Sequence, residues 1–135
     1  VGASVADPLR YWDVHLNGSR ILATAMERHQ CRTLVFSSTS TVYGEPEVFP
    51  LHEEMPTAPV HPYAQTKLAV EQMLGALCRS GNWRVACLRY FNPVGAHPSG
   101  RIGDDPPGQP THLIPCVTHM AAGRRHTTRR LRACS

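Results

Sequence analysis

Lysine is almost absent from this chain of 135 residues, because 13 of its 14 cationic side chains are arginine and only Lys67 is lysine. Long apolar runs are absent too, and no stretch approaches the roughly 18–20 residues of a membrane span. The five cysteines are odd in number and contain no C-x-x-C pair, and the eight histidines are dispersed. These patterns favour reduced thiols and a cytoplasmic protein, and we expect no metal site.

Acidic residues are missing from the last segment, 124–135, which holds five arginines. This basic tail accounts for the formal net charge of +4, since the remaining residues carry nine basic against ten acidic side chains. The tail has no aromatic residue to stack on bases, so any nucleic-acid binding would be nonspecific and sensitive to salt. We therefore expect no specific nucleic-acid partner.

Helical and strand patterns alternate along the rest of the chain. Apolar residues recur at helical spacing over residues 8–29 and 63–79, and two short apolar runs, 32–38 and 84–91, are typical of buried strands. A short helix is expected over 113–122. This order predicts an α/β fold with a parallel sheet and flanking helices, in which ligands lie beyond the carboxyl ends of the strands.

Three motifs fall at that edge of the predicted sheet. They are the hydroxyl-rich "SSTSTVYG" of residues 37–44, the pair Tyr63 and Lys67 in "PYAQTK", and "LRYFNPVGAHPSG" of residues 88–100. On a helix, Tyr63 and Lys67 lie one turn apart on the same face. Taken singly, the first motif also fits a Ser/Thr-rich turn and the second a solvated helix pair.

The order and spacing of the three motifs together resemble the extended short-chain dehydrogenase/reductase family. Within it, the likeness is to the branch that interconverts UDP-glucose and UDP-galactose at C4 of the sugar, a reaction of galactose metabolism. The match covers about residues 1–123 and includes "SVADPLRYWDVHLNGS" and "DPPGQP". It implies a partial Rossmann-like fold, the carboxyl-terminal half of an NAD-binding domain, with NAD as cofactor.

The resemblance implies roles for three catalytic residues. Tyr63 would be the general base that takes the proton of the 4-hydroxyl, and Thr39 would hydrogen-bond the sugar oxygen. A free phenol has a pKa near ~10, too high for a base at neutral pH, and a neighbouring ammonium stabilises the phenolate. Lys67 would supply that charge and would also bind the nicotinamide ribose.

Further residues receive binding roles by the same likeness. Ser37 and Phe91 would line the nicotinamide together with Tyr63 and Lys67. Asn92, His112 and Leu113 would contact the sugar nucleotide along with Thr39 and Tyr63, although His112 stands where these epimerases usually have asparagine.

Sugar-nucleotide 4,6-dehydratases carry similar motifs but follow the threonine with Asp-Glu, which perform acid–base catalysis during water elimination. Here the two positions hold Ser40 and Thr41, which have no carboxylate. The dehydratase alternative is therefore rejected on chemical grounds. Another NAD-dependent sugar-nucleotide epimerase remains an alternative, and whether N-acetylated sugars are accepted stays open.

A glycine-rich phosphate loop, which the resemblance implies, is missing, and the first residue is Val1. We therefore expect a fragment, inactive alone. Its parts would be the second half of an NAD-binding domain (1–110), the start of a substrate-binding region (111–123) and an unstructured or out-of-frame tail (124–135). An alternative is a non-catalytic remnant or interaction module, because helices 8–29 and 63–79 form a homodimer interface in this family.

Overall fold

The computed structural model describes residues 2–103 and 113–124 in two compact units, 1–91 and 92–135. The first unit contains α1 (Gly2–Ala6), α2 (Pro8–Trp12), the π-helical turn η1 (Asp13–Asn17), α3 (Gly18–Arg28), β1 (Thr33–Thr39), the 3₁₀ turn η2 (Ser40–Tyr43), α4 (Pro62–Ser80) and β2 (Arg84–Tyr90). The second contains α5 (Leu113–Ala121). No helix in the described ranges is long and apolar enough to cross a membrane.

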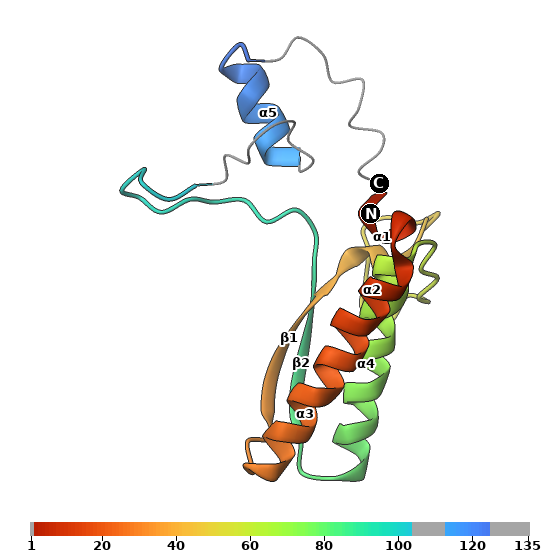
Figure 1. Cartoon of the computed structure of the whole chain (residues 1–135). Coiled ribbons are helices and arrows are strands. Elements are labelled where there is room, and N and C mark those ends of the chain that lie inside the picture. The colour runs from red at the N-terminus through yellow and green to blue at the C-terminus, as the bar shows by residue number, and fades with distance from the viewer. Residues whose placement is uncertain (1, 104–112, 125–135) are drawn as a thin grey trace. The chain divides into compact units, whose positions relative to one another are not determined.

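The two strands pair in parallel, in a register that runs from Thr33 opposite Arg84 to Thr39 opposite Tyr90. A parallel pair needs a long crossover connection, and here η2, a loop and α4 provide it. Figure 1 shows α4 beside the strands and next to the helical run of α2 and α3. The prediction of an α/β chain with a parallel sheet and flanking helices is confirmed.

The core of the first unit forms around α4, which contacts α2, both strands and η2. Ala64, Val70 and Leu74 of α4 expose at most 2% of their surface, and Val42 of η2 is completely buried. On α4 these positions are six and four residues apart, so that one side of the helix faces the core and the other faces outward. The apolar periodicity of residues 63–79 thus becomes a packed helix face.

The strands are less buried than the sequence predicts. Val35, Leu88 and Tyr90 expose 62%, 40% and 46% of their surface. Side chains alternate between the two faces of a sheet, and Ser38 and Arg89 on the other face contact α4. A continuous apolar run predicts a strand covered on both faces, whereas among residues 2–91 these three side chains stay open to solvent. The prediction of two buried strands is wrong for that face.

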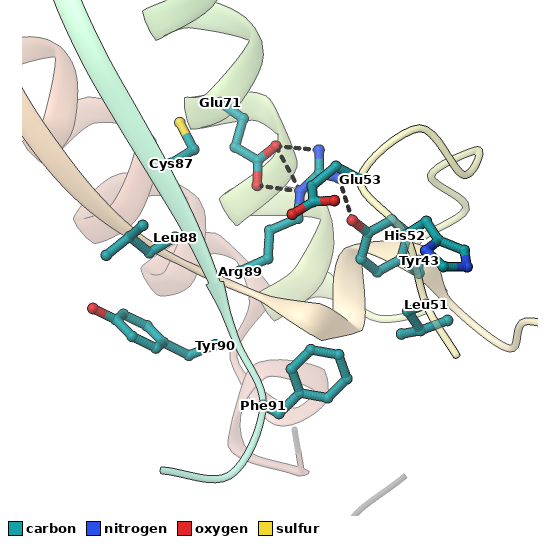
Figure 2. A pocket seen from close by; sticks show the side chains of 10 residues that line it. All are labelled: Tyr43, Leu51, His52, Glu53, Glu71, Cys87, Leu88, Arg89, Tyr90 and Phe91. Atoms are coloured by element: carbon teal, nitrogen blue, oxygen red, sulfur yellow. Dashed lines mark hydrogen bonds and ion pairs between the residues drawn. The ribbon is translucent and has the colours of Figure 1, made fainter. Parts of the chain in front are cut away.

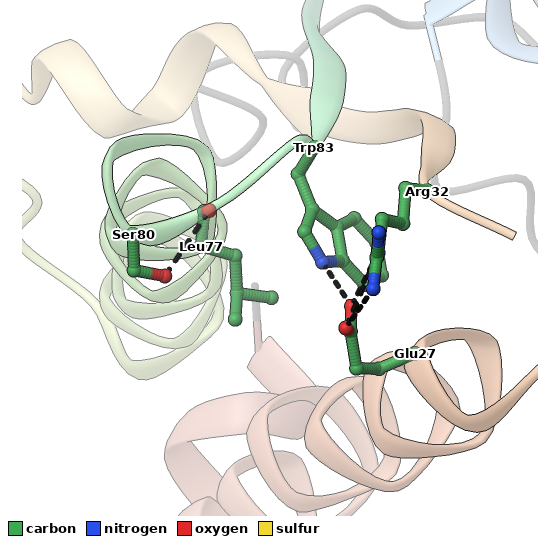
Figure 3. Close-up of polar contacts among 5 residues, drawn as sticks. All are labelled: Glu27, Arg32, Leu77, Ser80 and Trp83. Atoms are coloured by element: carbon green, nitrogen blue, oxygen red, sulfur yellow. Dashed lines mark hydrogen bonds and ion pairs between the residues drawn. The ribbon is translucent and has the colours of Figure 1, made fainter. Parts of the chain in front are cut away.

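The amino-terminal ends of both strands are fixed to the end of α3 by one carboxylate (Figure 3). Glu27 accepts a hydrogen bond from the buried indole of Trp83 at 2.7 Å and forms an ion pair with Arg32 at 2.6 Å. Trp83 immediately precedes β2 and Arg32 immediately precedes β1. Because Glu27 contacts the residue before each strand, the cluster holds the starts of β1 and β2 side by side, in agreement with their register.

The predicted helix over residues 8–29 is helical almost throughout but widens at η1. The backbone N–H of Gly18 donates to the carbonyl of Asp13, and the Asn17 side chain donates to the Asp13 carboxylate at 2.9 Å. A π-helical turn inserts one extra residue and so changes the direction in which later side chains point. His15 lies inside this turn and reaches α4.

A sharp turn at Gly44 closes η2 against the following loop. Gly44 has φ of +70°, and a Cβ atom there would lie 2.1 Å from the carbonyl oxygen of Ala58. Ala58 is held in place because its N–H donates to the carbonyl of Val42 at 3.0 Å. The turn therefore requires glycine.

We expect Gly44→Ala to lower the free energy of unfolding by at least about 1–3 kcal/mol, because the backbone strain alone costs that much and the overlap adds to it. Urea unfolding followed by circular dichroism measures the change. Gly81→Ala is the matched control, since a Cβ atom at Gly81 meets nothing within 4 Å. Equal stability of the two variants would contradict this account of the turn.

Candidate active site

Tyr63 and Lys67 lie on the first turns of α4, where it meets the carboxyl end of β1. The helix begins at Pro62, a residue favoured at the first helical position because it lacks an N–H group. Lys67 Nζ donates a hydrogen bond of 3.0 Å to the carbonyl oxygen of Ser37. Three of the predicted site residues, Ser37, Tyr63 and Lys67, are thereby brought together.

The Lys67 ammonium is held between a carbonyl oxygen and two aromatic rings. Its Nζ atom lies 4.9 Å from the ring centroid of Phe36 and 5.9 Å from that of Tyr63. Burial lowers the pKa of Lys67 from its ordinary value of 10.5. One of its three protons is used by Ser37, which leaves two donors for other partners.

Thr39 ends β1 and begins the turn η2. Its hydroxyl oxygen accepts a hydrogen bond from the N–H of Thr41 at 3.2 Å, and it lies 2.9 Å from the Thr41 hydroxyl. Thr39 is buried, with 7% of its surface exposed. This capping arrangement fixes the hydroxyl two residues beyond Ser37, at the same end of the sheet as Lys67.

A half-buried ion pair, not predicted from the sequence, joins β2 to α4 at this end (Figure 2). Arg89 of β2 donates to the carboxylate of Glu71 of α4, with the shortest contact at 2.7 Å, and to the Tyr43 hydroxyl at 2.8 Å. Glu71 also accepts a hydrogen bond from Ser38 of β1. The hydrogen bonds that Arg89 donates to the Glu71 carboxylate raise the pKa of Arg89 above its ordinary range. In the sequence, only the four-residue spacing of Lys67 and Glu71 indicates that Glu71 lies near the site, because residues four apart share one face of a helix.

The same ion pair borders a cavity of about 530 Å³ whose lining residues are labelled in Figure 2. Phe91, predicted to line the nicotinamide, is one of them, whereas Tyr63 and Lys67 are not. Phe91 is the last residue of the first unit and exposes 64% of its surface. Asn92 and Leu113 belong to the second unit, and His112 lies outside the described residues.

Three further rings surround Tyr63. Its ring centroid lies 5.6 Å from that of His15 and 6.4 Å from that of Tyr11, both edge-on, and 6.2 Å from that of His61, which is stacked. The sequence offered little to find them, because the histidines are dispersed. The four-residue spacing of Tyr11 and His15 on one helix was the only pattern present.

His61 caps the amino terminus of α4. Its Nδ1 atom accepts a hydrogen bond of 3.2 Å from the N–H of Ala64, so this nitrogen carries no proton. Burial lowers the pKa of His61 from its ordinary value of 6.5. Protonation would remove the cap and place a positive charge at the positive end of the helix dipole.

We expect the chain to lose stability as the pH falls below about 6.5, where the unfolded state binds the proton that folded His61 resists. His61→Asn keeps a capping oxygen but does not titrate, so its stability should fall less over the same pH range. Thermal unfolding of both proteins between neutral and mildly acidic pH measures the difference. Part of the loss should persist in the variant, because burial also lowers the pKa of His15. Identical pH profiles would contradict the assigned cap.

The family model described as "NAD dependent epimerase/dehydratase family" matches residues 1–131. UDP-glucose 4-epimerase of Bacillus subtilis is 53% identical over 125 residues, which cover 92% of this chain and 37% of that protein. The UDP-glucose 4-epimerase of Mus musculus is 49% identical over 127 residues, with 93% and 37% covered. The chain thus spans little more than a third of the length of these relatives.

Solved structures are similar as well. The Stenotrophomonas maltophila UDP-glucose 4-epimerase with bound NAD and formylated UDP-arabinopyranose superposes with a TM-score of 0.86 at 44% identity, covering 93% of this chain and 38% of that one. The Bifidobacterium longum UDP-glucose 4-epimerase in complex with NAD⁺ and UDP gives 0.83 at 43% identity, with the same coverage. The described fold therefore corresponds to part of a Rossmann-type epimerase.

Proposed function

The chain belongs to the NAD dependent epimerase/dehydratase family, and from this we propose that it is a segment of a UDP-glucose 4-epimerase, which interconverts UDP-glucose and UDP-galactose. One observation carries the proposal. The single lysine is anchored to the carbonyl of Ser37 beside the ring of Tyr63, at the carboxyl end of a parallel strand. Parallel sheets bind ligands at this edge.

The residues present fit a nicotinamide cofactor. Lys67 keeps two donor protons beyond its bond to Ser37, a number suited to the two hydroxyls of a ribose, and it is the sort of compact ammonium that a single ribose edge accommodates. We propose that Ser37, Tyr63, Lys67 and Phe91 hold NAD. Bound there, NAD would supply the hydride acceptor for the transient oxidation at C4 of the sugar.

In the proposed reaction Tyr63 is the general base. Its phenolate removes the proton of the 4-hydroxyl as C4 loses a hydride and becomes a carbonyl carbon, and it returns the proton after the sugar has turned over. Lys67 stabilises the phenolate by its charge. Thr39 donates a hydrogen bond to the sugar oxygen, and Asn92, His112 and Leu113 contact the sugar nucleotide.

We also propose that the assembled protein is a cytoplasmic homodimer that pairs through the helical segments 8–29 and 63–79. Support comes from the large apolar side chains that the first segment exposes. Leu9, Val14, Ile21 and Leu22 expose between 53% and 80% of their surface. The same surface is the specific support for the alternative function, a non-catalytic interaction module. Sedimentation of the chain with and without Ile21→Glu tests the interface.

A chimera tests the proposed activity. In it, this chain replaces the matching segment of Bacillus subtilis UDP-glucose 4-epimerase, which is 53% identical over 125 residues. We expect the purified chimera to bind NAD and to convert UDP-galactose into UDP-glucose. A folded, NAD-bound chimera without activity, measured beside the active parent enzyme, would contradict the proposal and favour the interaction module.

A further inference from the structure

His15 is joined to the backbone of Tyr63 through one buried hydroxyl. Its Nδ1 atom lies 2.8 Å from Oγ1 of Thr66, which is fully buried. The Thr66 hydroxyl in turn donates to the carbonyl oxygen of Tyr63 at 2.8 Å. The π-helical turn η1 and the first turn of α4 are therefore connected by two consecutive hydrogen bonds.

The direction of these bonds assigns the tautomer of His15. A threonine hydroxyl has a single proton, and Thr66 uses it on the Tyr63 carbonyl. Toward His15 the hydroxyl oxygen can therefore only accept, so Nδ1 of His15 must carry a proton. In the neutral ring this leaves Nε2 without one.

The imidazole is also neutral for reasons of charge. Burial lowers the pKa of His15, and the nearby Lys67 ammonium lowers it further. A neutral ring avoids placing a second cation beside Lys67. It also leaves the edge-on contact between His15 and Tyr63 as an ordinary aromatic contact, at a ring-centroid separation of 5.6 Å and an interplanar angle of 75°.

We propose that His15 is a positioning residue for Tyr63 in the reaction proposed above, on which this inference rests. Its Nδ1–H group holds the carbonyl of Tyr63 through Thr66, and its ring holds the phenol from the side. Tyr11 contacts both rings and extends the support, with its centroid 5.2 Å from that of His15. Tyr11 of α2 and His15 of the adjoining π-helical turn thus both contact the ring of Tyr63.

Nitrogen-15 NMR of the full 135-residue chain tests the geometry without any activity. We expect Nδ1 of His15 to be protonated and Nε2 bare at neutral pH, and His15→Leu to shift the aromatic resonances of Tyr63. Thr66→Val should abolish the preference for this tautomer. A proton on Nε2 alone in the neutral ring, or unshifted Tyr63 resonances, would overturn the inference.

Kinetics of the chimera test the consequence. Misplacing a reacting group by about 1 Å can cost about 100-fold, so His15→Leu should reduce kcat about 10- to 100-fold with little change in KM. His15→Asn, which keeps a donor, and His15→Phe, which keeps the ring, should each recover part of the loss. His29→Leu, an exposed position at the end of the same helical run, is the control.

The two proposals fail in different ways. An unchanged kcat in His15→Leu, or a loss confined to KM, would overturn the positioning role while leaving the epimerase function intact. A wild-type chimera without activity would instead refute the proposed function, and the NMR result would then still decide whether His15 holds Tyr63 as described.

Discussion

Replacing Tyr63 with phenylalanine should reduce epimerisation by the chimera about 10²- to 10⁴-fold, the usual contribution of a positioned general base. Only the phenolic oxygen is removed, so the ring contacts with Tyr11, His15 and His61 remain available. We therefore expect the variant to unfold at nearly the same temperature as the wild type. Initial rates of UDP-galactose conversion, with thermal unfolding in parallel, measure both effects.

Tyr11→Phe is the matched control for that experiment. Tyr11 lies in the same ring cluster and also loses only a hydroxyl, but it carries no proposed proton transfer. We expect its rate to stay within a few-fold of the wild type. A Tyr63→Phe variant as active as the Tyr11→Phe variant would exclude Tyr63 as the base.

The largest effect on stability is expected from Arg89→Leu. The side chain of Glu71 exposes 9% of its surface, and in this variant its carboxylate would lose the guanidinium that donates to both of its oxygens. Removing one partner of a buried ion pair typically costs about 3–5 kcal/mol, because the remaining charge stays buried. We expect a loss near the lower of these figures, because Arg89 is only half-buried and Ser38 still donates to Glu71. Urea unfolding of the chain measures the loss.

The double variant Glu71→Leu/Arg89→Leu tests whether the uncompensated charge of Glu71 causes the loss of stability in Arg89→Leu. Replacing both partners removes the uncompensated charge, so the double variant should be more stable than Arg89→Leu alone. A double variant that is less stable than the single one would show that the hydrogen bonds to Ser38 and Tyr43 matter more than the ion pair.

Local sequence patterns predicted the helices and strands of this structure, but they did not predict the contacts between elements that are distant in the sequence. Helical and strand periodicity placed α4 and both strands within a residue or two of their observed bounds. Ligands lie beyond the carboxyl ends of parallel strands, and this rule predicted that the Tyr63–Lys67 helix and the hydroxyl-rich segment beginning at Ser37 lie at the same edge of the sheet. In the structure Lys67 contacts Ser37.

The contacts that the sequence did not reveal all depend on packing. His15 meets Thr66 across 51 positions, and Ser38 meets Glu71 across 33, so no local pattern records either pair. The π turn was hidden because its residues fit an ordinary helix. The burial of the strands was overestimated. A continuous apolar run favours a strand that is packed on both faces, whereas among the described residues only one face of the two-stranded sheet is packed against helices.

Transfer of the C4 hydrogen tests the central claim most directly. UDP-galactose carrying deuterium at C4 is converted by the chimera in ordinary water, and the product is analysed by NMR. Because a hydride that leaves C4 and returns to it never meets solvent, we predict UDP-glucose with the deuterium still at C4. Loss of the deuterium to solvent, or no conversion by a folded chimera that binds NAD, would contradict the proposed epimerase function of this segment.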